Sequence, residues 1–543
     1  MTVPRALTIA VAVVLIGGLP ALPGGSRASA APAQIGAHIA FTVGERFGGD
    51  GNGDGFIDMP NTAEYVHNAV ACDAGCSEAR FDVLLTAGVT GLDLTPGGSG
   101  PSEYRWEISG PSLSRPLLYS SAYPELLVTV PEGRYQVQVA TGVRIGWARL
   151  TASTSHELTV DDILVVAVGD SYASGEGNPE APRRGGAEAR WADSDDPGAA
   201  AAHASDHRSS LAWPVRLALT LERSDPRSSV TFVSVAASGA RIDRGIVEDA
   251  SGASQVEQVR ALVGEREIDL LLVQAGGNDV GFARAVQALV EADPLLDPIC
   301  HDLLVENAFA SVADGDWSRG VSLGYDAPIS VVCRPAESNR GWEALPGLQG
   351  LPAAFSRLAD SLGDLTLGEV VLVGYPDPTG ADAGGNTCDE IVGDTAPPLG
   401  FHEIDSGEQR LGVERLLRPL NAALDEAARS HGWRYVGGID EAFAAGHGYC
   451  APWPDYGSST EPGGAASGRP SLGDPDRWFR NPGRNGGPML MGNGPVSWYR
   501  TAAQSAALQG PGTRFLTTGT LHPNEIGHDA IARLVLAALR DGD

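Results

Sequence analysis

From Asp161 to the C-terminus, short and mostly apolar runs alternate with segments of helical pattern, and this alternation constrains the fold more than any other feature. Runs of this kind are typical of strands buried on both faces of a sheet. The expected strands cover residues 163–168, 230–235, 270–274, 369–374 and 433–436. Because strands separated by helices form parallel sheets covered on both faces, we expect a three-layer α/β/α domain with a five-stranded parallel sheet.

A tight turn follows the first of these strands, with the sequence Gly169-Asp170-Ser171. Open α/β sheets bind their ligands beyond the carboxyl ends of the strands, so a serine at this point is a candidate nucleophile. The same residues also suit an ordinary turn, in which Asp170 and Ser171 cap the helix that follows. The turn alone leaves both interpretations open.

Two other strand ends and one distant segment carry residues that would complete acyl-transfer chemistry. Gly239 follows the second strand, Asn278 follows the third, and His522 precedes the last helix. Acyl transfer needs a nucleophile, a base and donors aimed at the developing oxyanion. We therefore predict Ser171 as nucleophile and His522 as base. The backbone N–H groups of Ser171 and Gly239 and the side-chain amide of Asn278 form the predicted oxyanion hole.

These blocks resemble the SGNH (GDSL-type) hydrolase family over roughly residues 161–541. In order they are Gly169-Asp170-Ser171 with Ser174-Gly175-Glu176-Gly177-Asn178, then Gly239, then Gly276-Gly277-Asn278-Asp279, and finally His522-Pro523-Asn524 with Gly527-His528. With its cysteines and export signal, the chain looks similar to the secreted actinobacterial lipases and esterases. The resemblance implies a carboxylic ester hydrolase that acts through a serine acyl-enzyme and needs no catalytic cofactor.

The chain departs from the family pattern at two positions. Tyr172 stands where the family name has leucine, at a position that varies within the family. The family usually has an aspartate three residues before the catalytic histidine, and here that residue is Gly519. We expect the backbone carbonyl of Gly519 to orient His522, because a carbonyl can fix the tautomer of an imidazole. A carboxylate from elsewhere, for example from residues 441–515, is the alternative.

Residues 31–160 differ from the rest, because short strand-like segments are separated there by turn residues. Regular short strands of this kind are typical of a β-sandwich. A turn at residues 131–133 leads into an alternating strand that carries Tyr135, and this resembles immunoglobulin-like modules in which a tyrosine braces the corner. We expect an all-β, immunoglobulin-like domain over residues 31–160, able to contact a cell surface or carbohydrate, before the hydrolase domain at residues 161–543.

A glycine-rich segment within this first region has the spacing of a calcium loop. Oxygen-bearing side chains stand at its positions 1, 3, 5 and 9, namely Asp50, Asn52, Asp54 and Asp58. Gly55 stands at position 6, where such loops turn sharply. Position 12 is Asn61 instead of glutamate, and Glu64 is the substitute ligand that we consider. The pattern predicts a structural calcium ion; a polar surface turn without an ion is the alternative.

Residues 1–30 have the features of an export signal: Arg5, an apolar run over residues 6–18 and an Ala28-Ser29-Ala30 cleavage site. The apolar run is short for a membrane span, which needs about 20 residues, and an uncleaved anchor is the alternative. The net charge of −30 and the pI of about 4.6 argue against nucleic acid or an anionic membrane surface as partner. We therefore expect a secreted protein without stable membrane insertion.

Export makes disulfides available to the chain, which contains six cysteines. Nearness in the sequence favours the pairs Cys72–Cys76, Cys300–Cys333 and Cys388–Cys450. Zinc is the rival interpretation, but the spacing of Cys and His does not match zinc sites.

The sequence leaves the ester substrate open. A lipase or esterase should have an apolar acyl groove, whereas a carbohydrate acetyl esterase on the same fold should have aromatic platforms. Trp453, Trp478 and Trp498 suit either enzyme. A surface binding protein with an inactive hydrolase domain is a rival of another class, although the retained Ser171 and His522 argue against it.

Overall fold

The computed structural model describes a large part of the chain, and the residues it describes fall into two compact units. The described residues are 36–68, 79–90, 103–145, 148–183, 187–250, 252–291, 301–319, 321–326, 330–335, 344–382, 384–392, 403–451, 497–510 and 519–541. The first unit comprises the chain up to Arg46 with His67–Ile163 and Glu222–Val230, and the second comprises Phe47–Val66, Leu164–Leu221 and Thr231–Asp543.

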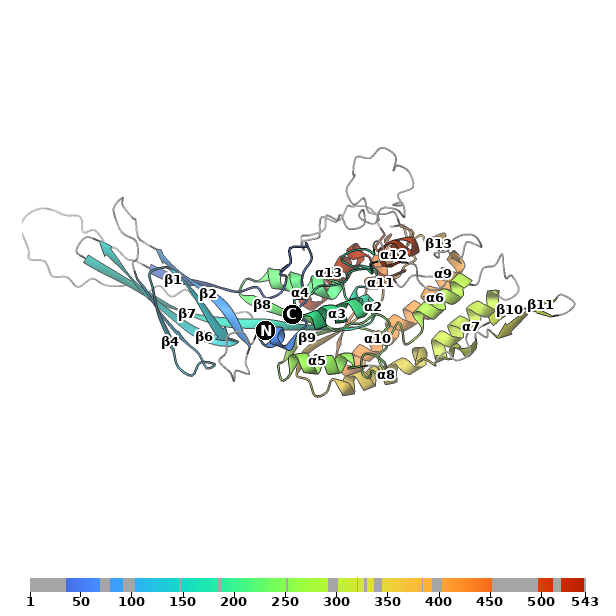
Figure 1. The fold of residues 1–543 in the computed structure, drawn as a ribbon, viewed down its shortest axis with the longest axis horizontal. Helices are drawn as coiled ribbons and strands as arrows, with labels where there is room; N and C mark the ends of the chain where they lie inside the picture. The colour runs from blue at the N-terminus through green and yellow to red at the C-terminus, as the bar shows by residue number, and fades with distance from the viewer. Residues whose placement is uncertain are drawn as a thin grey trace, which may run out of the picture. The chain divides into compact units, whose positions relative to one another are not determined.

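The first unit contains two antiparallel sheets (Figure 1). One sheet has the strand order β1 (Gly36–Val43), β2 (Arg80–Thr90) and β5 (Glu125–Pro131). The other has the order β4 (Leu117–Ser121), β3 (Tyr104–Ser109), β6 (Gly133–Ile145) and the first part of β7 (Ala148–Gly169). Side chains of β3 alternate between buried and exposed, as expected of strands with one face on a core.

The two sheets of the first unit share one hydrophobic core. Phe81 and Val83 of β2, Trp106 of β3 and Val137 of β6 are among its buried residues. Tyr135 is buried at the start of β6, and its hydroxyl donates a 2.7 Å hydrogen bond to the carbonyl of Pro131. The tyrosine therefore braces the corner between β5 and β6, as its position after the turn predicts.

The second unit is built on strands that pair in the order β8 (Ser228–Ser234), the last part of β7, β9 (Ile268–Gln274), β12 (Leu367–Val373) and β15 (Arg434–Val436). The pairs β7–β9, β9–β12 and β12–β15 are parallel. Residues 164–168 of β7 are completely buried. Burial on both faces explains why this strand is continuously apolar.

Helices and short hairpins connect and surround these strands. They are α1 (Ala63–His67), α2 (Ser171–Ser174), α3 (Pro197–Ser205), α4 (Trp213–Ser224), α5 (Gln255–Val263), α6 (Phe282–Glu291), α7 (His301–Asp314), η2 (Trp317–Arg319), β10 (Val321–Asp326), β11 (Ser330–Pro335), α8 (Gly347–Ser361), β13 (Glu390–Val392), β14 (Glu403–Asp405), α9 (Ser406–Gly412), η4 (Val413–Leu417), α10 (Arg418–His431), α11 (Ile439–Ala444), α12 (Ala502–Gln509) and α13 (Glu525–Arg540).

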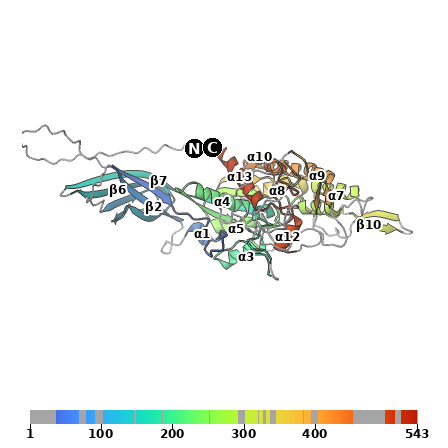
Figure 2. The same cartoon turned by 90° about the horizontal axis from the view of Figure 1, so that it is seen from above.

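The helices of the second unit pack in pairs around its strands (Figures 1 and 2). α8 packs against α10, and α10 also contacts β12 and β15. The backbone N–H of Trp213 at the start of α4 donates to Nδ1 of the buried His528 on α13, at 3.2 Å. Asn524 caps α13 by accepting from the N–H groups of Ile526 and Gly527, each at 3.0 Å.

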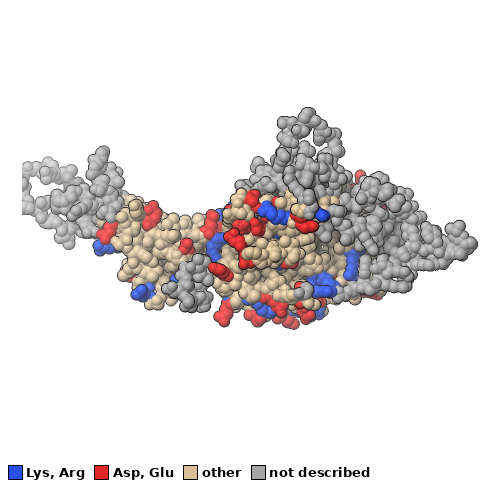
Figure 3. Space-filling model, viewed as in Figure 1, with Lys and Arg blue, Asp and Glu red and all other residues tan. Residues whose placement is uncertain are grey.

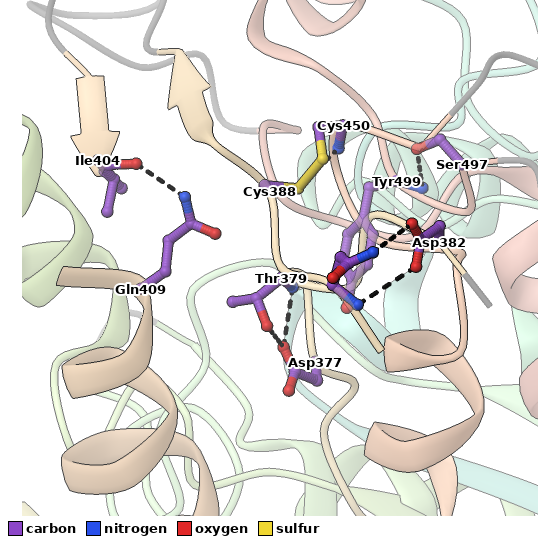
Figure 4. The surroundings of a disulfide bond; sticks show 10 residues. Asp377, Thr379, Asp382, Cys388, Ile404, Gln409, Cys450, Ser497 and Tyr499 are labelled. Carbon is purple, nitrogen blue, oxygen red and sulfur yellow. Dashed lines mark hydrogen bonds between the residues drawn. A yellow bond between two sulfur atoms is a disulfide. The ribbon is translucent and has the colours of Figure 1, made fainter. Parts of the chain in front are cut away.

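One disulfide, Cys388–Cys450, joins the segment after β12 to the turn after α11 (Figure 4). It is the pair that nearness in the sequence predicts. The other predicted pairs depend on Cys72, Cys76, Cys300 and Cys333, whose side chains lie outside the described residues, as does the expected export signal. No helix within the described ranges is long and apolar enough to cross a membrane.

The acidic composition is visible on the surface. Figure 3 shows acidic side chains spread over the described part of this face, with basic side chains among them.

Candidate active site

The predicted nucleophile lies where β7 turns into α2. Gly169 has φ +147°, and a Cβ there would lie 2.3 Å from the carbonyl oxygen of Gln274, so only glycine fits. Asp170 caps α2 by accepting from the N–H of Tyr172 at 3.0 Å. Ser171 is thus the first residue of the helix, and its N–H is one of those that a helix start leaves without an intrahelical partner. The turn therefore caps the helix and also places Ser171 at its first position.

Ser171 and His522 form a hydrogen-bonded pair, although they are 351 positions apart in the sequence. Nε2 of His522 lies 2.7 Å from Oγ of Ser171. Nδ1 of His522 lies 3.1 Å from the carbonyl oxygen of Thr520. Because a carbonyl only accepts, Nδ1 carries the proton and Nε2 is free to accept from the serine hydroxyl. The tautomer is the one that a general base requires.

The carbonyl that orients the imidazole belongs to Thr520, which corrects the prediction of Gly519. The Gly519 carbonyl instead accepts the backbone N–H of His522 at 3.3 Å. The chain turns tightly before the histidine, so the ring folds back onto the nearer carbonyl. The sequence pattern identified a backbone carbonyl as partner; Thr520 supplies the hydrogen bond to Nδ1, and the Gly519 carbonyl also raises the pKa of His522.

Burial lowers the pKa of His522, and the charge of Glu176 and the carbonyls of Thr520 and Gly519 partly oppose this effect. The pKa remains below its usual value. The imidazole is therefore neutral at neutral pH, which is the form that can take a proton from Ser171.

Tyr172, which the sequence treats as a variable position, contacts both His522 and the residue before it. Its ring centroid lies 4.8 Å from that of His522, and its hydroxyl donates a 2.9 Å hydrogen bond to the carbonyl of Leu521. Leu521 has φ +60°, a left-handed conformation that is unfavourable for a leucine. Tyr172 thus holds a strained backbone segment directly before His522.

The predicted oxyanion-hole donors follow β8 and β9. Nδ2 of Asn278 donates to the carbonyl of Ala240 at 3.0 Å, which fixes the amide beside the turn that carries Gly239. Gly239 has φ +79°, so its backbone conformation favours glycine, while a Cβ would meet no protein atom within 4 Å. Glycine therefore suits this position because of its backbone conformation.

Tyr375, which the sequence did not single out, joins two of the turns. Its hydroxyl donates to Oδ2 of Asp170 and accepts from the N–H of Gly277 at 2.9 Å. Burial raises the pKa of Asp170 to about 7, against the opposing hydrogen bonds from Tyr375 and Tyr172. The one available sequence signal was the position of Tyr375 just beyond the end of β12.

Arg500 ties the histidine segment to the serine segment. Its guanidinium donates to the carbonyl of Gly177 at 2.9 Å and to Oδ1 of Asn178 at 2.8 Å, and it forms a buried ion pair with Glu525. Its backbone N–H donates to the carbonyl of His522 at 2.8 Å. Arg500 lies in a stretch whose Gly- and Pro-rich composition gave no sign of this role.

No protein-family model and no curated protein matches the sequence. Among solved structures, the chain is similar to an extracellular lipase from Streptomyces rimosus, with 17% identity, a TM-score of 0.38 and coverage of 69% of this chain and 99% of the lipase. A phospholipase A1 from Streptomyces albidoflavus gives 18% identity, a TM-score of 0.34 and coverage of 70% and 98%. A carbohydrate acetylesterase from Sinorhizobium meliloti gives 12% identity and a TM-score of 0.22, with coverage of 51% of this chain and 88% of the acetylesterase.

The predicted calcium loop belongs to the second unit, not to the N-terminal strands. Its carboxylates accept mainly from the loop backbone: Asp50 from Gly53 at 2.7 Å and Asp58 from Gly51 at 2.6 Å. Asp54 forms an ion pair with Arg190.

Asn61, at position 12 of the loop, exchanges hydrogen bonds with the backbone of Ser234 instead of facing the loop. Within the described ranges, no group of three or more acidic, His or Cys side chains is arranged to hold a metal. As the residues lie here they do not fit a calcium ion, and calcium stays a prediction from the sequence pattern.

Proposed function

We propose that this chain is a secreted serine hydrolase that cleaves carboxylic esters, with the SGNH-type chemistry that its sequence blocks resemble. The observation that carries the proposal is the contact between Nε2 of His522 and Oγ of Ser171 at 2.7 Å, with Nδ1 held by a backbone carbonyl. A serine hydroxyl bonded to a neutral, oriented imidazole is an activated nucleophile. Secretion is proposed from the export signal at residues 1–30.

The first half-reaction forms an acyl-enzyme. Oγ of Ser171 attacks the ester carbonyl while Nε2 of His522 takes the hydroxyl proton. Negative charge develops on the carbonyl oxygen, where the N–H groups of Ser171 and Gly239 and the amide of Asn278 stabilise it. His522 then returns the proton to the departing alkoxide, and the alcohol leaves.

The second half-reaction repeats these steps with water. His522 takes a proton from water, the hydroxide adds to the acyl carbon, and the tetrahedral intermediate collapses. The C–O bond to Ser171 breaks, its oxygen regains the proton from His522, and the carboxylic acid is released. No step needs a group other than those of the chain, the ester and water.

The decisive experiment is a hydrolysis panel of p-nitrophenyl esters of graded chain length together with acetylated sugars. Wild-type protein and the Ser171→Ala variant are compared, and Ser171 is also challenged with a fluorophosphonate. We expect turnover and labelling with wild type and neither with the variant. Turnover that survives Ser171→Ala would refute the nucleophile, and an inactive, unlabelled wild type would favour a binding protein.

The same panel separates the two ester substrates. A carbohydrate esterase would prefer acetylated sugars over acyl chains. Trp498, one of the tryptophans considered as a platform, is buried and stacks on His447 with ring centroids 3.7 Å apart. It therefore offers no open aromatic surface, while Trp453 and Trp478 lie outside the described residues.

A further inference from the structure

We infer that Glu176 is a positioning residue for this reaction: its buried carboxylate supports the positive charge that forms on His522 and takes the place of the aspartate that the family usually has at position 519. The inference rests on the proposed function, because it concerns the base of that reaction. Glu176 lies in the second half of the nucleophile block and has no part in the steps described above.

Glu176 is held close behind the nucleophile. Its backbone N–H donates to the carbonyl of Ser171 at 3.1 Å, and its side chain is completely buried. A buried carboxylate needs partners, because removing its charge from water is very unfavourable. Oε2 lies 2.6 Å from Nδ1 of His207, and Oε1 accepts from Nε2 of Gln509. A hydrogen bond from Ser238, next to Gly239, adds a third contact.

The second observation concerns the space around Gly519. A Cβ at this position would lie 2.3 Å from Oε1 of Gln509, 2.7 Å from Cα of Gly177 and 2.7 Å from Oγ of Ser505. An aspartate therefore cannot stand at position 519 in this fold. The space is taken by Gln509, whose amide binds the Glu176 carboxylate. A carboxylate thus reaches the neighbourhood of His522 from another segment of the chain.

The electrostatics agree with this placement. Burial raises the pKa of Glu176, but the hydrogen bond and charge of His207 and the charge of His522 outweigh it and hold the pKa at about 2. Glu176 is therefore ionised at any pH at which the enzyme would work. Its charge raises the pKa of His522 against the effect of burial. A base with a higher pKa accepts the serine proton more readily.

His207 modulates this charge. It has φ +52°, stacks on Trp191 with ring centroids 4.4 Å apart, and is one-third exposed. Burial lowers its pKa, but the hydrogen bond and charge of Glu176 and the charge of Asp206 leave the pKa raised. A protonated His207 opposes the positive charge on His522, so loss of its proton exposes His522 to the full charge of Glu176.

Two other titratable groups near His522, His528 and Tyr172, carry no charge at neutral pH. His528 on α13 interacts electrostatically with His522, but burial holds its pKa well below the usual value, so it stays neutral. The phenol of Tyr172 is also buried, and its pKa is raised. Among the charges that shift the pKa of His522 most, Glu176 is the anionic side chain and His207 the modulating cation.

The test compares Glu176→Gln with His207→Asn in the full-length protein. Glutamine keeps the shape while removing the charge: its oxygen can accept from Gln509, and its amide nitrogen can donate to Nδ1 of a neutral His207. Asparagine tolerates the left-handed backbone of residue 207. In Glu176→Gln we expect kcat to fall roughly three- to tenfold with KM unchanged, and the pKa of His522 to fall. In His207→Asn we expect that pKa to rise. The readouts are the pH profile of kcat/KM and the NMR titration of 13C-labelled His522.

Glu180→Gln is the matched control, because Glu180 is a buried carboxyl on the same segment whose pKa burial raises to about 8. This substitution removes no charge below that pH, so the His522 titration should not move. A His522 pKa that stays fixed in both variants, or moves in the same direction in both, would overturn the inference. An inactive, unlabelled wild type refutes the proposed function instead, and the NMR titration still reports on Glu176.

Discussion

The hydroxyl of Tyr172 donates a 2.9 Å hydrogen bond to the carbonyl of Leu521, which directly precedes the base. Tyr172, the residue after Ser171, thereby fixes the backbone before His522. The contact spans 349 positions in the sequence and joins the segments of the proposed catalytic pair.

Tyr172→Phe should remove this hydrogen bond and leave the ring against His522. A buried hydrogen bond contributes about 0.5–1.5 kcal/mol, so we expect kcat to fall about two- to tenfold. Steady-state kinetics on a short p-nitrophenyl ester measure the change. Tyr123→Phe, at an exposed tyrosine of the first unit, is the control. Equal kinetics for both variants would mean that the contact does not position His522.

Asn278→Ala should lower kcat by about 10²- to 10³-fold, because it removes a donor from the predicted oxyanion hole. Asn278→Asp should lower kcat at least as much, since a carboxylate repels the developing oxyanion. KM should change little in either variant. Circular dichroism checks the fold, and a kcat within twofold of wild type would exclude Asn278 from the oxyanion hole.

The pH profile should follow the protonation of His522. Burial lowers its pKa below the usual value of 6.5, and only the neutral ring can act as base. Activity should therefore rise with pH through a pKa below 6.5, and a smaller second rise should follow as His207, whose pKa is raised, loses its proton. A profile of kcat/KM without a rise below pH 6.5 would contradict the described environment of His522.

Arg500→Met should destabilise the protein by about 3–5 kcal/mol, because it leaves the buried carboxylate of Glu525 without its cation. The double variant Arg500→Met/Glu525→Gln should recover part of the loss, since no buried charge remains unpaired. Thermal unfolding of both variants is the measurement. A double variant no more stable than the single one would show that the loss comes from the contacts of Arg500 with Gly177 and Asn178.

The pairing of Ser171 with His522 could be predicted because each residue stands in a short block of typical composition. The strand before Ser171 is fully buried, and such strands leave a clear apolar signal. Thr520 could not be separated from Gly519, because the choice between neighbouring carbonyls depends on how the chain turns. The contacts of Tyr375 and Arg500 join segments that are far apart in the sequence, so no local sequence pattern predicts them.

The position of the Asp50–Asp58 loop illustrates the same limit. Its place in the sequence assigns it to the N-terminal strands, whereas its contacts place it in the second unit. Asn52 donates to Asp193 at 2.8 Å, and Arg190 pairs with Asp54. Loop spacing describes which oxygens could converge, but the neighbouring chain decides which partners they take.

The tight packing at Gly519 also has an evolutionary meaning. An aspartate cannot be introduced there by one substitution, because Gln509 and Gly177 occupy the space of its Cβ. A substitution of Gln509 that came first would remove a hydrogen-bond donor from Glu176 while position 519 still lacked a carboxylate. We therefore expect positions 176, 509 and 519 to covary among homologues that descend from this sequence.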